Sequence, residues 1–243
     1  MIAIKTESLT KKYQMKTAVK DLNLAINEGE LFTLLGVNGA GKTTTIKMLS
    51  CLIKPTQGDA TLLGDSIVRN PHKVKEKINV SPQETAVAPN LTVKENLEFM
   101  AKIYGFHQKE ADIKVEEMLI TFGLLEVKGD KAKTLSGGMQ RRLSIAMALI
   151  SEPKILFLDE PTLGLDVLSR RELWQAIESL KGKITIILTT HYMEEVEALS
   201  DRVGIMAKGQ MKAIGTVEEL KRQTQTQSLE EAFVAIATRE GEK

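Results

Sequence analysis

Residues 36 to 43 read GVNGAGKT and match the pattern GxxxxGK[ST] at every fixed position. An apolar run, GELFTLLG (29–36), precedes the stretch, and KTTTIKMLSCLI (42–53), which has apolar residues at helical spacing, follows it. A strand, a glycine-rich loop and a helix in this order let backbone N–H groups and a helix N-terminus hold phosphate. The flanking strand and helix argue against a chance glycine-rich turn. The stretch therefore predicts an α/β fold built around a phosphate-binding loop.

Three side chains at the end of this loop have distinct expected tasks. Lys42 should reach the outer phosphates of a nucleotide, Thr43 can offer its hydroxyl to Mg²⁺, and Thr44 can support the inner phosphates. The rest of the loop should contact phosphate through its backbone: Gly36, Val37, Asn38, Gly39, Ala40 and Gly41. The expected ligands are a nucleotide and Mg²⁺.

A second stretch, KILFLDE (154–160), ends a short apolar run with two carboxylates. Its strand should bring Asp159 to the sheet edge beside the phosphate loop, where a carboxylate can hold Mg²⁺. Side chains alternate along extended backbone, so we expect Glu160 to point elsewhere and to be free to act on a water as a general base. Such a pair is often only a solvated strand end, and the complete phosphate loop upstream favours the functional interpretation.

The remaining pattern predicts one domain, residues 1–243, with an internal segment that differs in charge and in periodicity. Short apolar runs such as ITIILTTH (184–191) suit strands buried on both faces of a parallel sheet. Residues 84–145 instead combine high charge with helical periodicity. We therefore expect a helical lobe over 84–145, set into an α/β core formed by 1–83 and 146–216.

Two further regions have weaker patterns. Residues 14–30 and 58–68 alternate enough to suggest an antiparallel flank of strands. In the tail, residues 217–243, one helical face would carry Leu229, Ala232, Phe233 and Ile236. We expect this helix to dock on its own domain; binding of a partner is the alternative.

Composition limits the classes of function. Lys and Arg number 33 against 32 Asp and Glu, without a long block of one sign, so no nucleic-acid partner is expected. The apolar runs fall short of the roughly 20 residues that a spanning helix needs. The single cysteine, Cys51, allows no internal disulfide, which suits the cytosol. We expect a cytoplasmic globular protein.

Six motifs in a fixed order resemble those of a known family. Besides GVNGAGKTT and ILFLDE, the chain contains SPQE, LSGGM, PTLGLD and TTH. Over nearly its whole length it resembles the nucleotide-binding subunit of an ATP-binding cassette transporter. The resemblance implies a P-loop NTPase (RecA-like) core with an antiparallel β flank, an inserted α-helical subdomain carrying the signature LSGGM, and hydrolysis of ATP with Mg²⁺.

The resemblance also implies roles for single residues. Tyr13 would stack on adenine, with a tyrosine packed at a strand end as the alternative. Gln83 would approach Mg²⁺ and the attacking water, although a solvent-facing loop glutamine is the plainer interpretation. His191 would contact the γ-phosphate and orient Glu160 or the water, and Asp166 would cross a dimer interface. The signature residues would contact ATP: Leu135, Ser136, Gly137 and Gly138.

Partners follow from the same resemblance. Two chains would form a head-to-tail homodimer around ATP, with each signature closing over the nucleotide of the other chain. LSGGMQRR, with Met139 where glutamine is usual, and THYMEE look like the exporter branch, whose ATPases join a separate transmembrane permease at the inner face of the membrane. Soluble relatives acting on ribosomes or DNA, and a nucleotide sensor without turnover, are the rival classes.

Basic residues surround the signature. We expect them to form a solvated face, with phosphate attraction as the weaker alternative. They are Lys128, Lys131, Lys133, Arg141 and Arg142.

Overall fold

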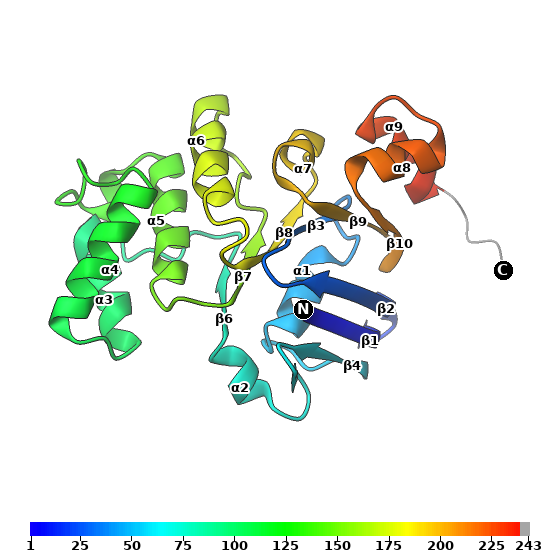
Figure 1. The fold of residues 1–243 in the computed structure, drawn as a ribbon, viewed down its shortest axis with the longest axis horizontal. Helices are drawn as coiled ribbons and strands as arrows, with labels where there is room; N and C mark the ends of the chain where they lie inside the picture. Colours follow the sequence, from blue (N-terminus) through cyan, green and yellow to red (C-terminus); the bar gives the residue numbers. More distant parts are fainter. Residues whose placement is uncertain (239–243) are drawn as a thin grey trace.

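The computed structural model describes residues 1–238 as two β-sheets and the helices that pack on them (Figure 1). The strands are β1 (Ile2–Tyr13), β2 (Lys16–Asn27), β3 (Leu31–Leu35), β4 (Gln57–Leu62), β5 (Asp65–Ser66), β6 (Ile78–Ser81), β7 (Ile155–Asp159), β8 (Thr185–Thr190), β9 (Arg202–Ala207) and β10 (Gln210–Gly215). The α-helices are α1 (Lys42–Leu49), α2 (Pro71–Lys75), α3 (Val93–Ile103), α4 (Gln108–Thr121), α5 (Gly137–Leu149), α6 (Val167–Glu178), α7 (Met193–Leu199), α8 (Val217–Thr224) and α9 (Leu229–Thr238).

The larger sheet positions the predicted motifs. Its strand order is β10-β9-β3-β8-β7-β6, and only the β9–β10 pair within it is antiparallel. Every residue of β3, β7 and β8 is buried, as expected for strands covered on both faces. In the register of β8, Thr190 pairs with Leu35 and Thr189 with Asp159. The phosphate loop, the acidic pair and His191 therefore leave the sheet at the same edge.

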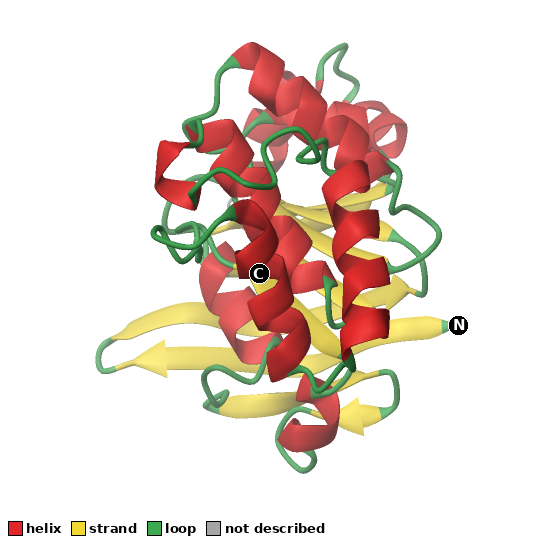
Figure 2. Ribbon diagram, turned by 90° about the vertical axis from the view of Figure 1, so that its left-hand side faces the viewer, coloured by secondary structure: helices red, strands yellow, loops and turns green. Residues whose placement is uncertain are grey.

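The smaller sheet is the expected antiparallel flank. Its order is β2-β1-β4-β5, and the observed pairs β1–β2 and β1–β4 confirm the antiparallel arrangement. Buried residues of this sheet share one hydrophobic core with Ile46 of α1, Phe32 of β3 and Phe157 of β7. Helix α1 is thereby fixed to both sheets. Figure 2 shows the flank strands at one end of the molecule, reaching past the helices.

The expected helical segment contains α3, α4 and the start of α5, grouped on one side of the molecule away from the flank (Figure 1). A capping box of Thr92 and Glu95 begins α3. Helix α5 continues past residue 145 to Leu149, so the expected boundary falls inside a helix. Ile145 and Leu149 are buried in a core that also contains strand residues, and this packing joins the segment to the sheet.

The tail docks on its own domain. Leu229, Phe233 and Ile236 are buried in a core shared with β9 and α8, and Ala232 on the same helix is buried as well. Residues 239–243 of the predicted tail lie outside the described residues. No helix within residues 1–238 is both long enough and apolar enough to span a membrane.

Candidate functional site

Backbone geometry explains the glycines of the phosphate loop. Gly41 has φ 108° and caps α1, and a Cβ atom there would lie 2.6 Å from the carbonyl oxygen of Ala18. A Cβ at Gly36 would lie 2.5 Å from the carbonyl oxygen of Met206. Both contacts are too short for any side chain, so the sharp turn that opens α1 requires glycine at these positions.

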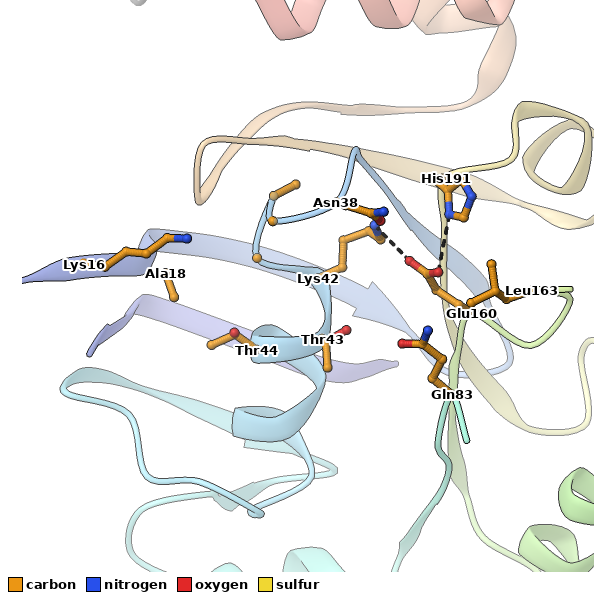
Figure 3. A pocket seen from close by; sticks show the side chains of 13 residues that line it. Lys16, Ala18, Asn38, Lys42, Thr43, Thr44, Gln83, Glu160, Leu163 and His191 are labelled. Carbon is orange, nitrogen blue, oxygen red and sulfur yellow. Dashed lines mark ion pairs between the residues drawn. The ribbon is translucent and has the colours of Figure 1, made fainter. Parts of the chain in front are cut away.

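A cavity of about 430 Å³ lies over this loop (Figure 3). It brings together the predicted residues Asn38, Gly39, Ala40, Gly41, Lys42, Thr43, Thr44, Gln83, Glu160 and His191. Sequence reasoning missed three other lining residues, Lys16, Ala18 and Leu163. Lys16 and Ala18 come from the flank strand β2, and β-periodicity alone could not show that this strand reaches the loop.

Glu160 lies at the centre of the polar groups. Its carboxylate pairs with Lys42 Nζ at 3.2 Å, and Nδ1 of His191 lies 3.4 Å from its other oxygen (Figure 3). At 8% exposure a carboxylate requires a partner, and Lys42 supplies it; the action of Glu160 on a water stays a prediction. The alternation of extended backbone does not set the direction of this side chain, because Glu160 has φ 47° and lies beyond the end of β7.

Asp159 faces different partners from its neighbour. Its Oδ1 atom accepts hydrogen bonds from Thr43 Oγ1 at 3.2 Å and from Thr189 Oγ1 at 2.5 Å. Thr189 also accepts from the backbone N–H of Glu160 at 3.0 Å, so it fixes both members of the acidic pair. Thr189 was missed by sequence reasoning, because its place beside Asp159 comes from the register of β7 and β8, which the structure reveals.

The oxygen atoms of Thr43 and Asp159 suit Mg²⁺. Hydroxyl and carboxylate oxygens are hard ligands, and Mg²⁺ is commonly held by one or two carboxylates together with substrate phosphates. The described residues contain no cluster of three or more His, Cys, Asp or Glu side chains that could hold a metal alone. This donor set fits a metal that binds together with a nucleotide.

The signature residues lie outside this cavity. Ser136 is exposed and caps α5, where its Oγ accepts from the N–H of Met139 at 3.2 Å. A Cβ at Gly137 would meet nothing within 4 Å, whereas a Cβ at Gly138 would lie 2.6 Å from Ser169 Oγ. Leu135 is buried. Ser136 and Gly137 thus form an open helix N-terminus, while Gly138 lets α5 approach α6.

This difference predicts unequal effects of two alanine substitutions. Gly138→Ala should lower the free energy of unfolding by about 1–3 kcal/mol, because the new methyl group overpacks the contact with Ser169. Gly137→Ala should change it by no more than about 1 kcal/mol, since its Cβ enters open space and alanine favours helix. Thermal and urea unfolding of both variants measure this, and equal losses would contradict the assignment.

Asp166 and Tyr13 also lie outside the cavity lining, as do Gly36, Val37 and Asp159. Asp166 is exposed and caps α6, accepting from the N–H groups of Leu168 and Ser169. These bonds, chiefly the one from Ser169, lower the pKa of the Asp166 carboxyl. Tyr13 is not among the described lining residues, but it pairs with Lys16, which is. A role for either residue stays a prediction.

The expected solvated basic face is only partly correct. Lys128, Lys131 and Lys133 are exposed, but Arg141 is 4% exposed and Arg142 is also largely covered. Arg141 donates to backbone carbonyls, and Arg142 pairs with Glu172 at 3.0 Å and donates to the carbonyl of Phe122. Buried guanidinium groups need such acceptors, so these two residues belong to the interior.

Sequence comparison identifies the family of this chain. The family model described as "ABC transporter" matches residues 19–163. The linearmycin resistance ATP-binding protein LnrL of Bacillus subtilis is 45% identical over 89% of this chain and 70% of its own length. The human phospholipid-transporting ATPase ABCA3 is 42% identical over 90% of this chain, which spans only 13% of that relative.

Solved structures agree with this placement. The ATP-binding subunit of an ABC transporter superposes with a TM-score of 0.85 and 29% identity, covering 96% of this chain and 99% of the other. The dimeric cassette MJ0796, bound to ADP and Pi in a post-hydrolysis state, gives a TM-score of 0.79 and 28% identity, covering 88% and 98%. With the P-loop NTPase fold and the observed cavity, these matches show that the chain belongs to the ABC transporter family, as an ATP-binding subunit that hydrolyses ATP.

Proposed function

We propose that this chain powers export through a separate membrane permease by forming an ATP-dependent head-to-tail homodimer. One observation is the main support for the dimer. Lys42, Gln83, Glu160 and His191 meet in one cavity, whereas Ser136 lies outside it with an exposed hydroxyl at an open helix N-terminus. Helix N-termini with free N–H groups bind phosphate. In the proposed dimer, this half-site completes the cavity of the partner chain.

Within one chain, the residues divide the work of hydrolysis. The backbone N–H groups of residues 36–41 and the Lys42 ammonium hold the phosphates, and Glu160 accepts a proton from, or orients, the attacking water. His191, with Nδ1 3.4 Å from the Glu160 carboxylate, is placed to orient that carboxylate. Thr43, Asp159 and Gln83 would hold Mg²⁺, which when bound neutralises charge on the phosphate oxygens. Tyr13 would stack on adenine, and Asp166 would reach across the interface.

Export is supported by the named activities of the relatives. LnrL is named for resistance to linearmycin and ABCA3 for transport of phospholipid, whereas neither name concerns ribosomes or DNA. In the proposal, the helical segment and Gln83 pass the closing motion to the permease, which places the chain at the inner face of the membrane. The cargo would be recognised by the permease, since this cavity is built for phosphate and water.

Purification of the tagged full chain from detergent-solubilised membranes tests the transport assignment. The expected result is a multispanning membrane protein at equal stoichiometry with the ATPase, whose hydrolysis rate changes in the complex. Recovery of ribosomal proteins or of DNA in stoichiometric amounts would instead support the rival class and contradict export.

A further inference from the structure

Arg141 makes an unusual pair of contacts inside the protein. It lies on α5, five residues after Ser136, and only 4% of its surface is exposed. One guanidinium nitrogen, Nη1, donates to the carbonyl oxygen of Pro82 at 2.6 Å, and Nη2 donates to the carbonyl oxygen of Gln83. The planar guanidinium group thus donates hydrogen bonds to the carbonyl oxygens of two consecutive residues. The second of these, Gln83, lines the cavity.

A second contact lies one turn further along α5. Ser144 is buried, and its Oγ atom is 3.5 Å from both Ser81 Oγ and the N–H of Ala86. The same face of α5 therefore touches the segment 81–86 before and after Gln83. Strand β6 ends at Ser81, so the two carbonyls gripped by Arg141 lie beyond its ladder with β7. Without Arg141 these two carbonyl oxygens would lose a charged donor.

We propose that Arg141 is a positioning residue that makes the signature motif and Gln83 move together, so that each nucleotide site of the dimer senses the other. This inference rests on the proposed dimer. When Ser136 docks on the nucleotide of the partner chain, α5 is displaced as a unit and carries the backbone of Gln83 with it. The Gln83 side chain, which projects into the cavity near Glu160 and Thr43 (Figure 3), is thereby set in place. Hydrolysis in one site then depends on the occupancy of the other.

Charge and geometry can be separated at this position. Burial lowers the pKa of the Arg141 guanidinium, and the negative charge of Asp159 opposes that effect. Arg141→Lys keeps a positive charge but loses the fork that matches two carbonyls. If the two hydrogen bonds to the carbonyls of Pro82 and Gln83 are required, lysine will not restore cooperative ATP hydrolysis. If a positive charge at position 141 is sufficient, lysine will restore it.

The test compares Arg141→Gln, Arg141→Lys and the matched control Arg142→Gln. Arg142 occupies the next position of α5 but contacts Phe122 and Glu172 instead of the segment 81–86. We expect wild type to hydrolyse ATP cooperatively. Both Arg141 variants should show a Hill coefficient of about 1 and about 10-fold lower kcat, with ATP affinity of the monomer within about 2-fold of wild type. Arg142→Gln should keep the cooperativity.

Two further experiments test the coupling, the first without measuring turnover. Hydrogen exchange of the amides of 83–86 in the nucleotide-free protein should speed up in the Arg141 variants and not in Arg142→Gln. In a Gln83→Ala background, Arg141→Gln should lower kcat by less than about 2-fold. Arg141 acts through the Gln83 side chain, so its loss has little further effect once that side chain is removed.

The inference would be overturned by unchanged cooperativity in Arg141→Gln, by full rescue with lysine, or by an equal loss in Arg142→Gln. A wild-type chain that neither dimerises with ATP nor hydrolyses it cooperatively would overturn the proposed dimer itself.

Discussion

The Glu160→Gln chain should bind ATP as wild type does and lose turnover by at least about 100-fold, the contribution typical of a general base. Glutamine keeps the size of the side chain but cannot accept a proton. It also removes the negative charge that faces Lys42 at 3.2 Å and His191 at 3.4 Å. Phosphate release at saturating MgATP measures the turnover, and equilibrium binding of a fluorescent ATP analogue measures the affinity.

Glu30→Gln is the matched control for this substitution. Glu30 has the same 8% exposure as Glu160 and is also ion-paired, with Arg202 at 3.2 Å, but it precedes β3 at the opposite end of that strand from the phosphate loop. The control should lose stability and keep the turnover of each folded molecule. Undiminished turnover in Glu160→Gln would show that Glu160 is not the general base. An equal loss of turnover in Glu30→Gln would show that removing any buried carboxylate charge lowers turnover.

Ser136→Arg should spare ATP binding by the monomer and reduce hydrolysis by at least about 100-fold, comparable to the loss of a key donor in a preorganised site. Ser136 is exposed and outside the cavity, so its replacement leaves the phosphate loop untouched. In the dimer, the arginine side chain would fill the space where the γ-phosphate of the partner chain must lie. The same two assays separate binding from turnover.

Ser228→Arg controls for the lost helix cap. Oγ of Ser228 accepts from the N–H of Glu231 at 3.2 Å, which is the distance between Ser136 Oγ and the N–H of Met139. Either substitution should cost about 1 kcal/mol of stability through the cap. Only Ser136→Arg should abolish hydrolysis. Normal turnover in Ser136→Arg would contradict the shared site.

The sequence predicted those parts of the site that strand ends bring together. Residues at the ends of buried parallel strands gather at one sheet edge, and by this rule Asp159 was expected beside the phosphate loop. Its carboxylate accepts a hydrogen bond from Thr43 of that loop, while the roles of Lys42, Asp159 and His191 stay predictions. The conformation of Glu160 was not predictable, because a left-handed residue just after a strand leaves no periodic signal. Arg141 was misjudged because charge alone suggested solvent, although it shares a helical face with the buried residues Ser144 and Ile145.

Tyr13 shows a different limit of the sequence. The residue was assigned by resemblance, and the structure places it at the end of β1, next to a lining residue and outside the lining itself. A stacking contact depends on the position of a ligand as well as of the chain. Likewise, the proposed task of the signature needs a second chain, and in this chain Ser136 and Gly137 form an exposed helix N-terminus.

Sedimentation of the Glu160→Gln chain with and without MgATP tests the composite site most directly. Without nucleotide the chain should sediment as the 26.9 kDa monomer, and with MgATP as a dimer of about twice that mass that retains two ATP molecules. Adding Ser136→Arg to the same chain should return it to the monomer while ATP remains bound. A Glu160→Gln chain that binds MgATP and stays at 26.9 kDa would contradict the head-to-tail dimer.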